Sequence, residues 1–375
     1  MRLLLDTDRL QNLICNIGNY LPNGIADVEG IARRAKARDY AAMELLAAAF
    51  ARVAFITPEA ARDVHSAFTR GWLGTQQDEL TLSSNNEPHG SEQFVEPAGL
   101  PSTFWNPFWS IVHGHREMGA AELTTRVAAL GPALPSSFYE RAEAAAHSHP
   151  RLANVSVYEV LPPYTLALLG SLPEGSLGND FCHLLVDNSF DVEVLERNCE
   201  EIQFLPPLLR CLSIRILQVH DLWHITAGFW TTSLHEHAIS SFQLEQFGHH
   251  YSAMYLAVSA FRTLHNKNAF LFLQQVAAEA WRFSTRCPAF MEIVWEDEWH
   301  KPVADIRRLH GIPVFDSIYE PELIEHLFAG VGYTIFKAVE RIDPVLRLPV
   351  SEKLGQVGLK LHMLKYPGWP RNKPS

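Results

Sequence analysis

The chain has 375 residues, 47% of them apolar, which is enough to bury one large hydrophobic core or two smaller ones. Its formal net charge is −11 and it contains no block of lysine and arginine, a balance that argues against nucleic acid as a partner. It has no apolar run of about 18 residues that could cross a bilayer, and its five cysteines lack Cys-x-x-Cys spacing, so we expect reduced thiols in a cytosolic compartment.

The N-terminal third of the chain predicts helices that are interrupted by one long loop. Apolar residues at helical spacing predict helix over 27–70, with a helix start indicated by Thr-Pro-Glu at 57–59, and again over 117–147. Residues 71–107 between them are rich in Gln, Ser, Asn, Pro and Gly and predict a loop. We expect the aromatic end of this loop, at 104–109, to dock on the core.

The rest of the chain is also predicted to be helical. A turn at 172–178 leads into a short helix at 178–188, and a strongly apolar helix follows at 206–228. Further helices are predicted at 233–247, 250–265, 268–286, 288–298, 302–309 and 320–341.

Alternating runs of β-branched residues do not persist, so no sheet is expected. The predicted fold class is therefore all-α. We expect a single large helical domain over 1–312, with an insertion at about 71–135, and a C-terminal helical extension with an irregular tail over 313–375.

The most informative segment is 220–224, with the sequence His-Asp-Leu-Trp-His. His220 and His224 are four residues apart, so on a helix both imidazoles share one face and can hold one metal ion. Asp221 is turned by about 100° from His220. It can join the ligands or orient a histidine from behind.

A carboxylate from the following helix could complete such a site. Gly228 and Thr232 indicate that one helix ends and another begins near Thr232 or Ser233, which puts Glu236 in the first turn of the second helix. A tight turn would bring Glu236 back beside the histidines. Mixed histidine and carboxylate ligands suit Zn, Fe(II) or Mn better than Mg, and the absence of thiolate argues against a structural zinc site.

Each of these residues also has a purely structural interpretation. Two histidines four residues apart are often exposed surface residues or hydrogen-bonded polar residues of the core. Asp221 could be exposed, and Ser233-x-x-Glu236 is also a capping box. The adjacent histidines at 249–250 make a poor ligand set. Spacing alone therefore leaves both the metal site and the structural interpretation open.

The spacing His-Asp-x-x-His, then eleven residues, then Glu resembles the metal motif of the ubiquinone (coenzyme Q) biosynthesis family, the fourth protein of the mitochondrial Coq series. His220, Asp221, His224 and Glu236 occupy its four ligand positions.

Two further segments resemble the same family. The turn Leu-Pro-Glu-Gly-Ser-Leu-Gly at 172–178 is similar to a turn of the family, and Trp-Glu-Asp-Glu-Trp at 295–299 is similar to its C-terminal Trp-acid-x-x-Trp segment. The similarity covers roughly 150–312 and is weaker across the N-terminal helices.

The resemblance implies an all-helical enzyme with one divalent metal ion, zinc being favoured and iron or manganese being alternatives. It implies that His220, Asp221, His224 and Glu236 are both the metal ligands and the catalytic residues. The implied reaction is an oxidative decarboxylation and hydroxylation at ring carbon 1 of a polyprenylated hydroxybenzoate.

The resemblance also implies partners and a location. The partners are a polyprenylated aromatic substrate or another isoprenoid lipid, a membrane surface, a second copy in a homodimer, and other quinone-biosynthesis enzymes. The location is the cytoplasmic face of a bacterial inner membrane, with peripheral attachment. Apolar residues of the predicted helices 250–265 and 268–286 could line a groove for the prenyl tail, or could be ordinary core packing.

Several residues around the motif depart from the family's pattern. His235 stands where the family has glycine, and with His237 it could alter the ligand shell or tune the proton chemistry of the metal. Ser240, Ser241 and Gln243 stand where a lysine and an acid are expected.

Two segments, 71–135 and 313–375, have no counterpart in a typical member of the family. With the replaced residues, they leave two other functions open. One is a divergent enzyme of specialised metabolism that acts on a different lipophilic substrate. The other is a non-catalytic scaffold that binds prenyl lipids for partner enzymes.

Overall fold

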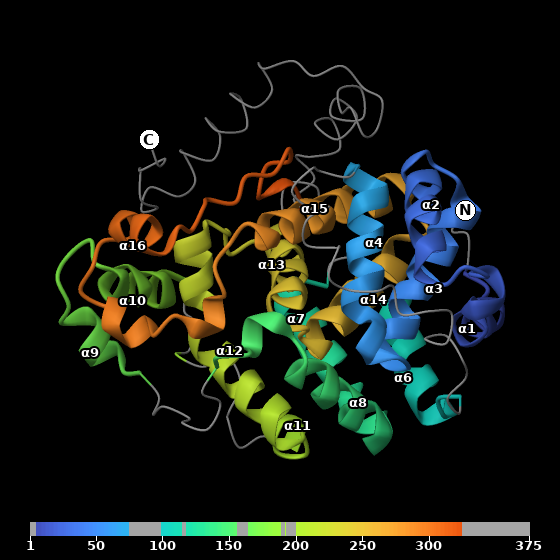
Figure 1. The fold of residues 1–375 in the computed structure, drawn as a ribbon, viewed down its shortest axis with the longest axis horizontal. Helices are drawn as coiled ribbons and strands as arrows, with labels where there is room; N and C mark the ends of the chain where they lie inside the picture. The colour runs from blue at the N-terminus through green and yellow to red at the C-terminus, as the bar shows by residue number, and fades with distance from the viewer. Residues whose placement is uncertain are drawn as a thin grey trace. The chain divides into compact units, whose positions relative to one another are not determined.

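A computed structural model of the chain describes residues 5–74, 99–114, 118–155, 164–188, 192 and 200–324. Contacts between Cα atoms divide the chain into two units, Met1–Pro321 and Glu322–Ser375, and almost all described residues belong to the first. Within the described ranges this unit contains helices and no strand, which confirms the predicted all-α class (Figure 1). No helix in these ranges is both long enough and apolar enough to cross a membrane.

The α-helices of the first unit, in chain order, are α1 (Thr7–Cys15), α2 (Ile25–Lys36), α3 (Tyr40–Phe55), α4 (Ala61–Leu73), α6 (Ser102–Val112), α7 (Ala120–Ala128), α8 (Ser136–His147), α9 (Leu166–Gly170), α10 (Leu177–Asn188), α11 (Glu200–Gln203), α12 (Pro207–Ala227), α13 (Ser233–Phe247), α14 (His250–Thr263), α15 (Lys267–Thr285) and α16 (Val303–His310). Short 3-10 helices connect several of them, at Ile17–Tyr20, Pro58–Ala60, Gly131–Ala133, Pro150–Leu152, Phe290–Glu292 and Trp295–Glu298.

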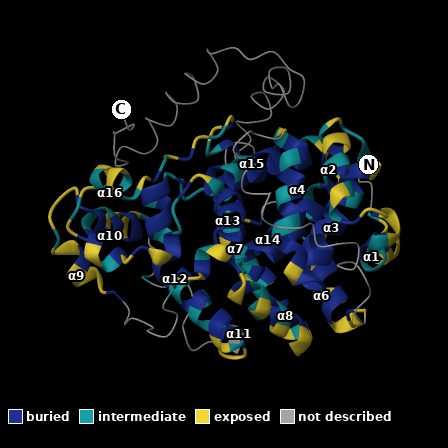
Figure 2. Ribbon diagram, viewed as in Figure 1, coloured by how far each residue is buried: buried dark blue, intermediate teal, exposed yellow. Residues whose placement is uncertain are grey.

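Helix α13 lies in the core of the unit. It packs along α15 and against α14, and every residue of α13 except Ser233 and Glu236 is buried (Figure 2). Helices α2, α3 and α4 pack on one another, and α3 and α4 in turn contact α14 and α15. The exposed residues of the described chain gather on peripheral helices such as α8 and α9 (Figure 2). The core therefore holds α13 rigidly and leaves Glu236 at its accessible end.

The segment predicted as helical over 27–70 forms three helices, and the helix start predicted at 57–59 is confirmed, since Pro58–Ala60 leads into α4. It breaks first at Arg38, whose φ of 72° lies in the left-handed region. Asp39 then caps α3, because its side chain accepts a hydrogen bond from the backbone N–H of Ala42 while Arg34 binds the same carboxylate. Local capping thus overrides a continuous helical pattern.

The loop predicted over 71–107 is wrong for residues 71–73, which end α4, and for residues 102–107, which lie in α6. Pro107 stands inside this helix, where it removes one backbone hydrogen bond. The helix is nevertheless stabilised by its aromatic side chains, because Phe104 and Phe108 are fully buried against Phe55 of α3. The predicted docking of the aromatic segment is therefore confirmed, whereas residues 75–98 of the predicted loop lie outside the described residues.

The helix predicted over 288–298 is also wrong. This segment forms two short 3-10 helices, joined where the indole N–H of Trp295 donates to the carbonyl of Phe290. Residues 325–341 of the last predicted helix lie outside the described residues.

Candidate metal centre

Helices α12 and α13 are joined by a short turn that folds the second back on the first. Helix α12 ends at Gly228, whose φ of 82° suits glycine and whose N–H donates to the carbonyl of His224. Helix α13 begins after Thr232, whose side chain accepts from the N–H of His235. The predicted helix boundary is thus confirmed. Because Thr232 is the cap, Ser233 and Glu236 do not form the alternative capping box.

The C-terminal end of α12 is held from the last part of the unit. The guanidinium of Arg307, on α16, donates to the carbonyls of Ile225 and Thr226 at 2.8 Å each. The N–H of Phe315 donates to the carbonyl of Ala227, also at 2.8 Å. These bonds satisfy carbonyls that a helix end leaves without partners, and so fix the turn that carries the candidate site.

Three side chains converge at this turn. The Nε2 atoms of His220 and His224 are 3.0 Å apart. The carboxylate of Glu236 lies 3.5 Å from His220 Nε2 and 3.3 Å from His224 Nε2. Ligand atoms on one cation at about 2.1 Å lie about 3.0–3.4 Å apart in octahedral or tetrahedral geometry. The spacing and the chemistry of this donor set therefore fit a divalent metal ion.

Asp221 lies at the same cluster. One of its carboxylate oxygens and one ring nitrogen each of His220 and His224 all lie within 4.8 Å of one another. The structure thus brings together all four residues that the sequence singled out, while their role as ligands stays a prediction.

Exposure of the cluster is one-sided. The side chain of His224 has no exposed surface, whereas those of His220 and Glu236 are 22% and 29% exposed. Any molecule that reaches the cluster from solvent therefore meets His220 and Glu236 first.

The titration of the cluster reflects burial and mutual attraction. Burial opposes ionisation of Glu236, but the neighbouring imidazoles of His224 and His220 outweigh it and hold its pKa below the usual range. Burial also opposes protonation of His224, yet Glu236 and Asp221 raise its pKa. Burial raises the pKa of Asp221, with His220 and His224 acting against it. Without a metal, the attraction between Glu236 and the imidazole of His224 thus favours a protonated histidine beside an ionised carboxylate.

The tautomer of His224 suits metal binding. Its Nδ1 lies 3.3 Å from the carbonyl of Phe229 and 3.2 Å from that of Trp230. Carbonyls only accept, so Nδ1 carries a proton. In the neutral ring Nε2 then presents its lone pair to the cluster. A backbone carbonyl behind a ligating histidine is a common arrangement in metal sites.

Behind His220 lies a chain of polar side chains that sequence reasoning did not assign to the site. The Nδ1 of His220 is 2.7 Å from the amide nitrogen of Gln243. The hydroxyl of Ser252, on α14, donates to the amide oxygen of Gln243 at 3.0 Å and lies 2.9 Å from Nδ1 of His249. Gln243 is seven residues from Glu236, hence on the same face of α13, and this spacing was the available signal.

The other residues that depart from the family's pattern do not reach the cluster. The Nδ1 of His235 accepts from the backbone N–H of Trp230, and burial lowers the pKa of His235 to about 3, so it is neutral and braces the turn. The hydroxyl of Ser240 donates to the carbonyl of Glu236, and that of Ser241 to the carbonyl of Ala277. Among the described residues, Gln243 is the one replaced residue that hydrogen-bonds the side chain of a candidate ligand, whereas Ser240 contacts only the backbone of Glu236.

The helices that could have lined a groove for a prenyl tail are packed into the core. The apolar residues proposed for that role are buried: Met254, Tyr255, Leu256, Val258 and Phe261 on α14, Leu264 at its C-cap, and Phe270, Phe272, Leu273, Val276 and Trp281 on α15. The structure therefore favours the core-packing interpretation for these side chains.

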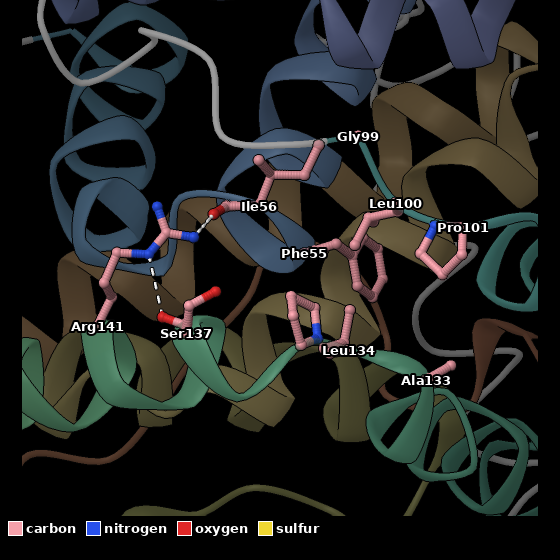
Figure 3. A pocket seen from close by; sticks show the side chains of 10 residues that line it. Phe55, Ile56, Gly99, Leu100, Pro101, Ala133, Leu134, Ser137 and Arg141 are labelled. Carbon is pink, nitrogen blue, oxygen red and sulfur yellow. Dashed lines mark hydrogen bonds between the residues drawn. The ribbon is translucent and has the colours of Figure 1, made fainter.

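A pocket of about 280 Å³ lies elsewhere in the unit, between the end of α3 and the start of α8 (Figure 3). Phe55, Leu100 and Leu134 line it, and Arg141 at its edge donates to the carbonyls of Ile56 and Ser137. None of the four candidate ligands lines this pocket, so it is separate from the candidate metal centre.

Comparison with known proteins supports the resemblance seen in the sequence. Residues 148–316 match the model of the family described as coenzyme Q (ubiquinone) biosynthesis protein Coq4. A crystal structure of a candidate ubiquinone biosynthesis protein from Nostoc punctiforme PCC 73102 superposes on the chain with a TM-score of 0.44 and 21% sequence identity. The superposition covers 56% of this chain and 97% of the Nostoc chain. No curated protein matches significantly. The predicted resemblance is thus confirmed over residues 148–316, which are similar to the coenzyme Q biosynthesis protein Coq4 family.

Proposed function

We propose that the chain is a metal-dependent enzyme of ubiquinone biosynthesis that acts at ring carbon 1 of a polyprenylated hydroxybenzoate, by oxidative decarboxylation and hydroxylation. The observation that carries the proposal is the convergence of His220, His224 and Glu236 at distances that suit one cation. The family match over 148–316 supports a role in ubiquinone biosynthesis. The resemblance of the His-Asp-x-x-His and Glu motif supports the reaction at ring carbon 1.

In this proposal the burial of each residue decides from which side it holds the metal ion. The buried His224, fixed by two carbonyls, holds the cation from the protein side, while the part-exposed His220 and Glu236 hold it at the accessible edge. Asp221, whose charge is disfavoured by burial, gains a compensating partner. When bound, a divalent metal would polarise a carboxylate or phenolate oxygen of the substrate. Zinc is the favoured ion, with iron and manganese as alternatives.

The metal site is tested by metal analysis of purified variants. We expect wild type to contain about one equivalent of metal, and His224→Ala and Glu236→Ala to lose most of it, because each removes one of the converging donors. His147→Ala, which removes an exposed histidine of α8, is the control and should keep the metal. Unchanged metal content in both ligand variants would overturn the proposed centre.

The reaction is tested by deleting the gene in its host and identifying what accumulates. A carboxylated prenyl-hydroxybenzoate is the expected result, and complementation with the Glu236→Ala variant should fail. Normal quinone levels would instead indicate another lipophilic substrate. Full rescue by the ligand variants would indicate a lipid-binding scaffold. The proposal also includes a homodimer, which analytical sedimentation would test. It includes peripheral attachment to the inner membrane, which binding to liposomes would test.

A further inference from the structure

The polar chain behind His220 links two helices to the candidate metal centre. Gln243 belongs to α13 and Ser252 to α14, and the two residues are 4% and 0% exposed. In this arrangement every donor of the chain points toward the candidate metal centre: Ser252 donates to Gln243, and the amide nitrogen of Gln243 faces His220 Nδ1. Nδ1 of His220 then accepts a hydrogen bond from the amide of Gln243. The ring proton of a neutral His220 is therefore on Nε2, the atom that faces His224 and Glu236.

A bound cation requires the opposite arrangement at His220. Its Nε2 must present a lone pair, so the ring proton moves to Nδ1 and needs an acceptor there. Every member of the chain can reverse its role. The amide of Gln243 can turn over to offer its oxygen to His220, its nitrogen then donates to Ser252, and the hydroxyl of Ser252 donates to His249 Nδ1. The exchange keeps the three hydrogen bonds of the chain, moves the ring proton of His249 from Nδ1 to Nε2, and adds no charge to a buried position.

We propose that Gln243, backed by Ser252 and His249, is a positioning residue for the metal: its amide reverses when a cation binds and thereby holds His220 in the tautomer that ligates. The inference rests on the proposed metal centre. A carboxylate at 243 could only accept, and would fix one tautomer permanently. The amide, by contrast, serves both the metal-free and the metal-bound state.

The first test measures affinity for zinc alone, by competition with a chromophoric chelator. Gln243→Leu should bind zinc about 10- to 100-fold more weakly than wild type, the usual effect of removing a partner behind a ligating histidine. Gln243→Glu should bind at least as tightly as wild type, because it supplies the acceptor. Gln275→Leu is the matched control, since the amide of Gln275 contacts Trp72 and Glu279 instead of the histidines. It should retain wild-type affinity.

The second test reads the tautomer directly, by two-dimensional NMR of the ring nitrogens in protein labelled with ¹⁵N-histidine. Zinc should move the proton of wild-type His220 from Nε2 to Nδ1, as judged against a His220→Ala spectrum. In metal-free Gln243→Glu the proton should already be on Nδ1. This readout stays informative if Gln243→Leu fails to fold.

The outcomes separate this inference from the function on which it depends. Wild type that binds no zinc would remove the metal centre itself. Wild type that binds zinc, with Gln243→Leu binding equally well, would overturn the role of Gln243 alone. A His220 ring proton on the same nitrogen in metal-free and zinc-bound wild type would also overturn it.

Discussion

At the scale of single residues, His224 and Glu236 form the most strongly coupled pair of the candidate centre. Their attraction raises the pKa of His224 and lowers that of Glu236 against the effect of burial on each. The same attraction makes a proton the natural competitor of a metal ion. Zinc should therefore be released on acidification, and we expect its apparent affinity to rise with pH.

In the metal-free protein the pair also makes stability depend on pH. The raised pKa of His224 stabilises the fold below the ordinary histidine value of 6.5, and this contribution is lost as pH rises through the raised pKa. The lowered pKa of Glu236 contributes above its ordinary value of 4.5 and is lost only as pH falls through the lowered one. Both contributions are full between 4.5 and 6.5. In thermal melts with chelator present, Glu236→Gln should therefore lower Tm most at pH 6 and least at pH 9. A constant difference would contradict the coupling.

At the scale of elements, the end of α12 depends on α16. Arg307→Met should lower the free energy of unfolding by about 2 kcal/mol, because two carbonyls lose a charged donor. Arg308→Met is the matched control, since among the described residues Arg308 makes only a surface pair with Asp305, and its effect should stay within about 0.5 kcal/mol. Urea unfolding of both variants provides the measurement. Equal effects would show that the cap does not stabilise α12.

The contrast between α13 and α6 shows what sequence could predict. The start of α13 was predictable because glycine and threonine are local signals whose geometry needs no tertiary partner. Helix α6 was not, because its aromatic residues become helical only by packing on Phe55 and Phe261. The partnership of Gln243 with His220 depends likewise on the register between α12 and α13, which no short motif encodes.

At the scale of the molecule, the first unit buries several neutral histidines. Burial lowers the pKa of His65, His149 and His235 to about 3, and of His237 and His250 to about 4. Each takes up a proton on unfolding at any pH between its lowered pKa and 6.5. Stability should therefore fall as pH drops from 6.5 toward 4, with up to about 1.4 kcal/mol per pH unit from each histidine.

Acid unfolding tests this expectation, followed by tryptophan fluorescence and far-UV circular dichroism. His65 offers the sharpest variant, since it stacks on Phe50 at 4.3 Å and both of its ring nitrogens are buried with no hydrogen-bond partner in the described part of the chain. His65→Phe should move the acid midpoint to lower pH, because phenylalanine keeps the stacking and takes up no proton. A midpoint that stays in place would show that other groups govern acid unfolding.

The contacts at the end of α12 also set a lower limit for any shortened version of the protein. A fragment cut after His310 would keep all four candidate ligands, yet it would lack Phe315, whose N–H pairs with the carbonyl of Ala227 and whose ring lies 4.6 Å from that of Phe229. The turn between α12 and α13 would then lose the hydrogen bond and the ring contact that Phe315 provides. Expression trials that seek a minimal stable domain should therefore extend at least to Pro321, where Thr232 also finds its acceptor.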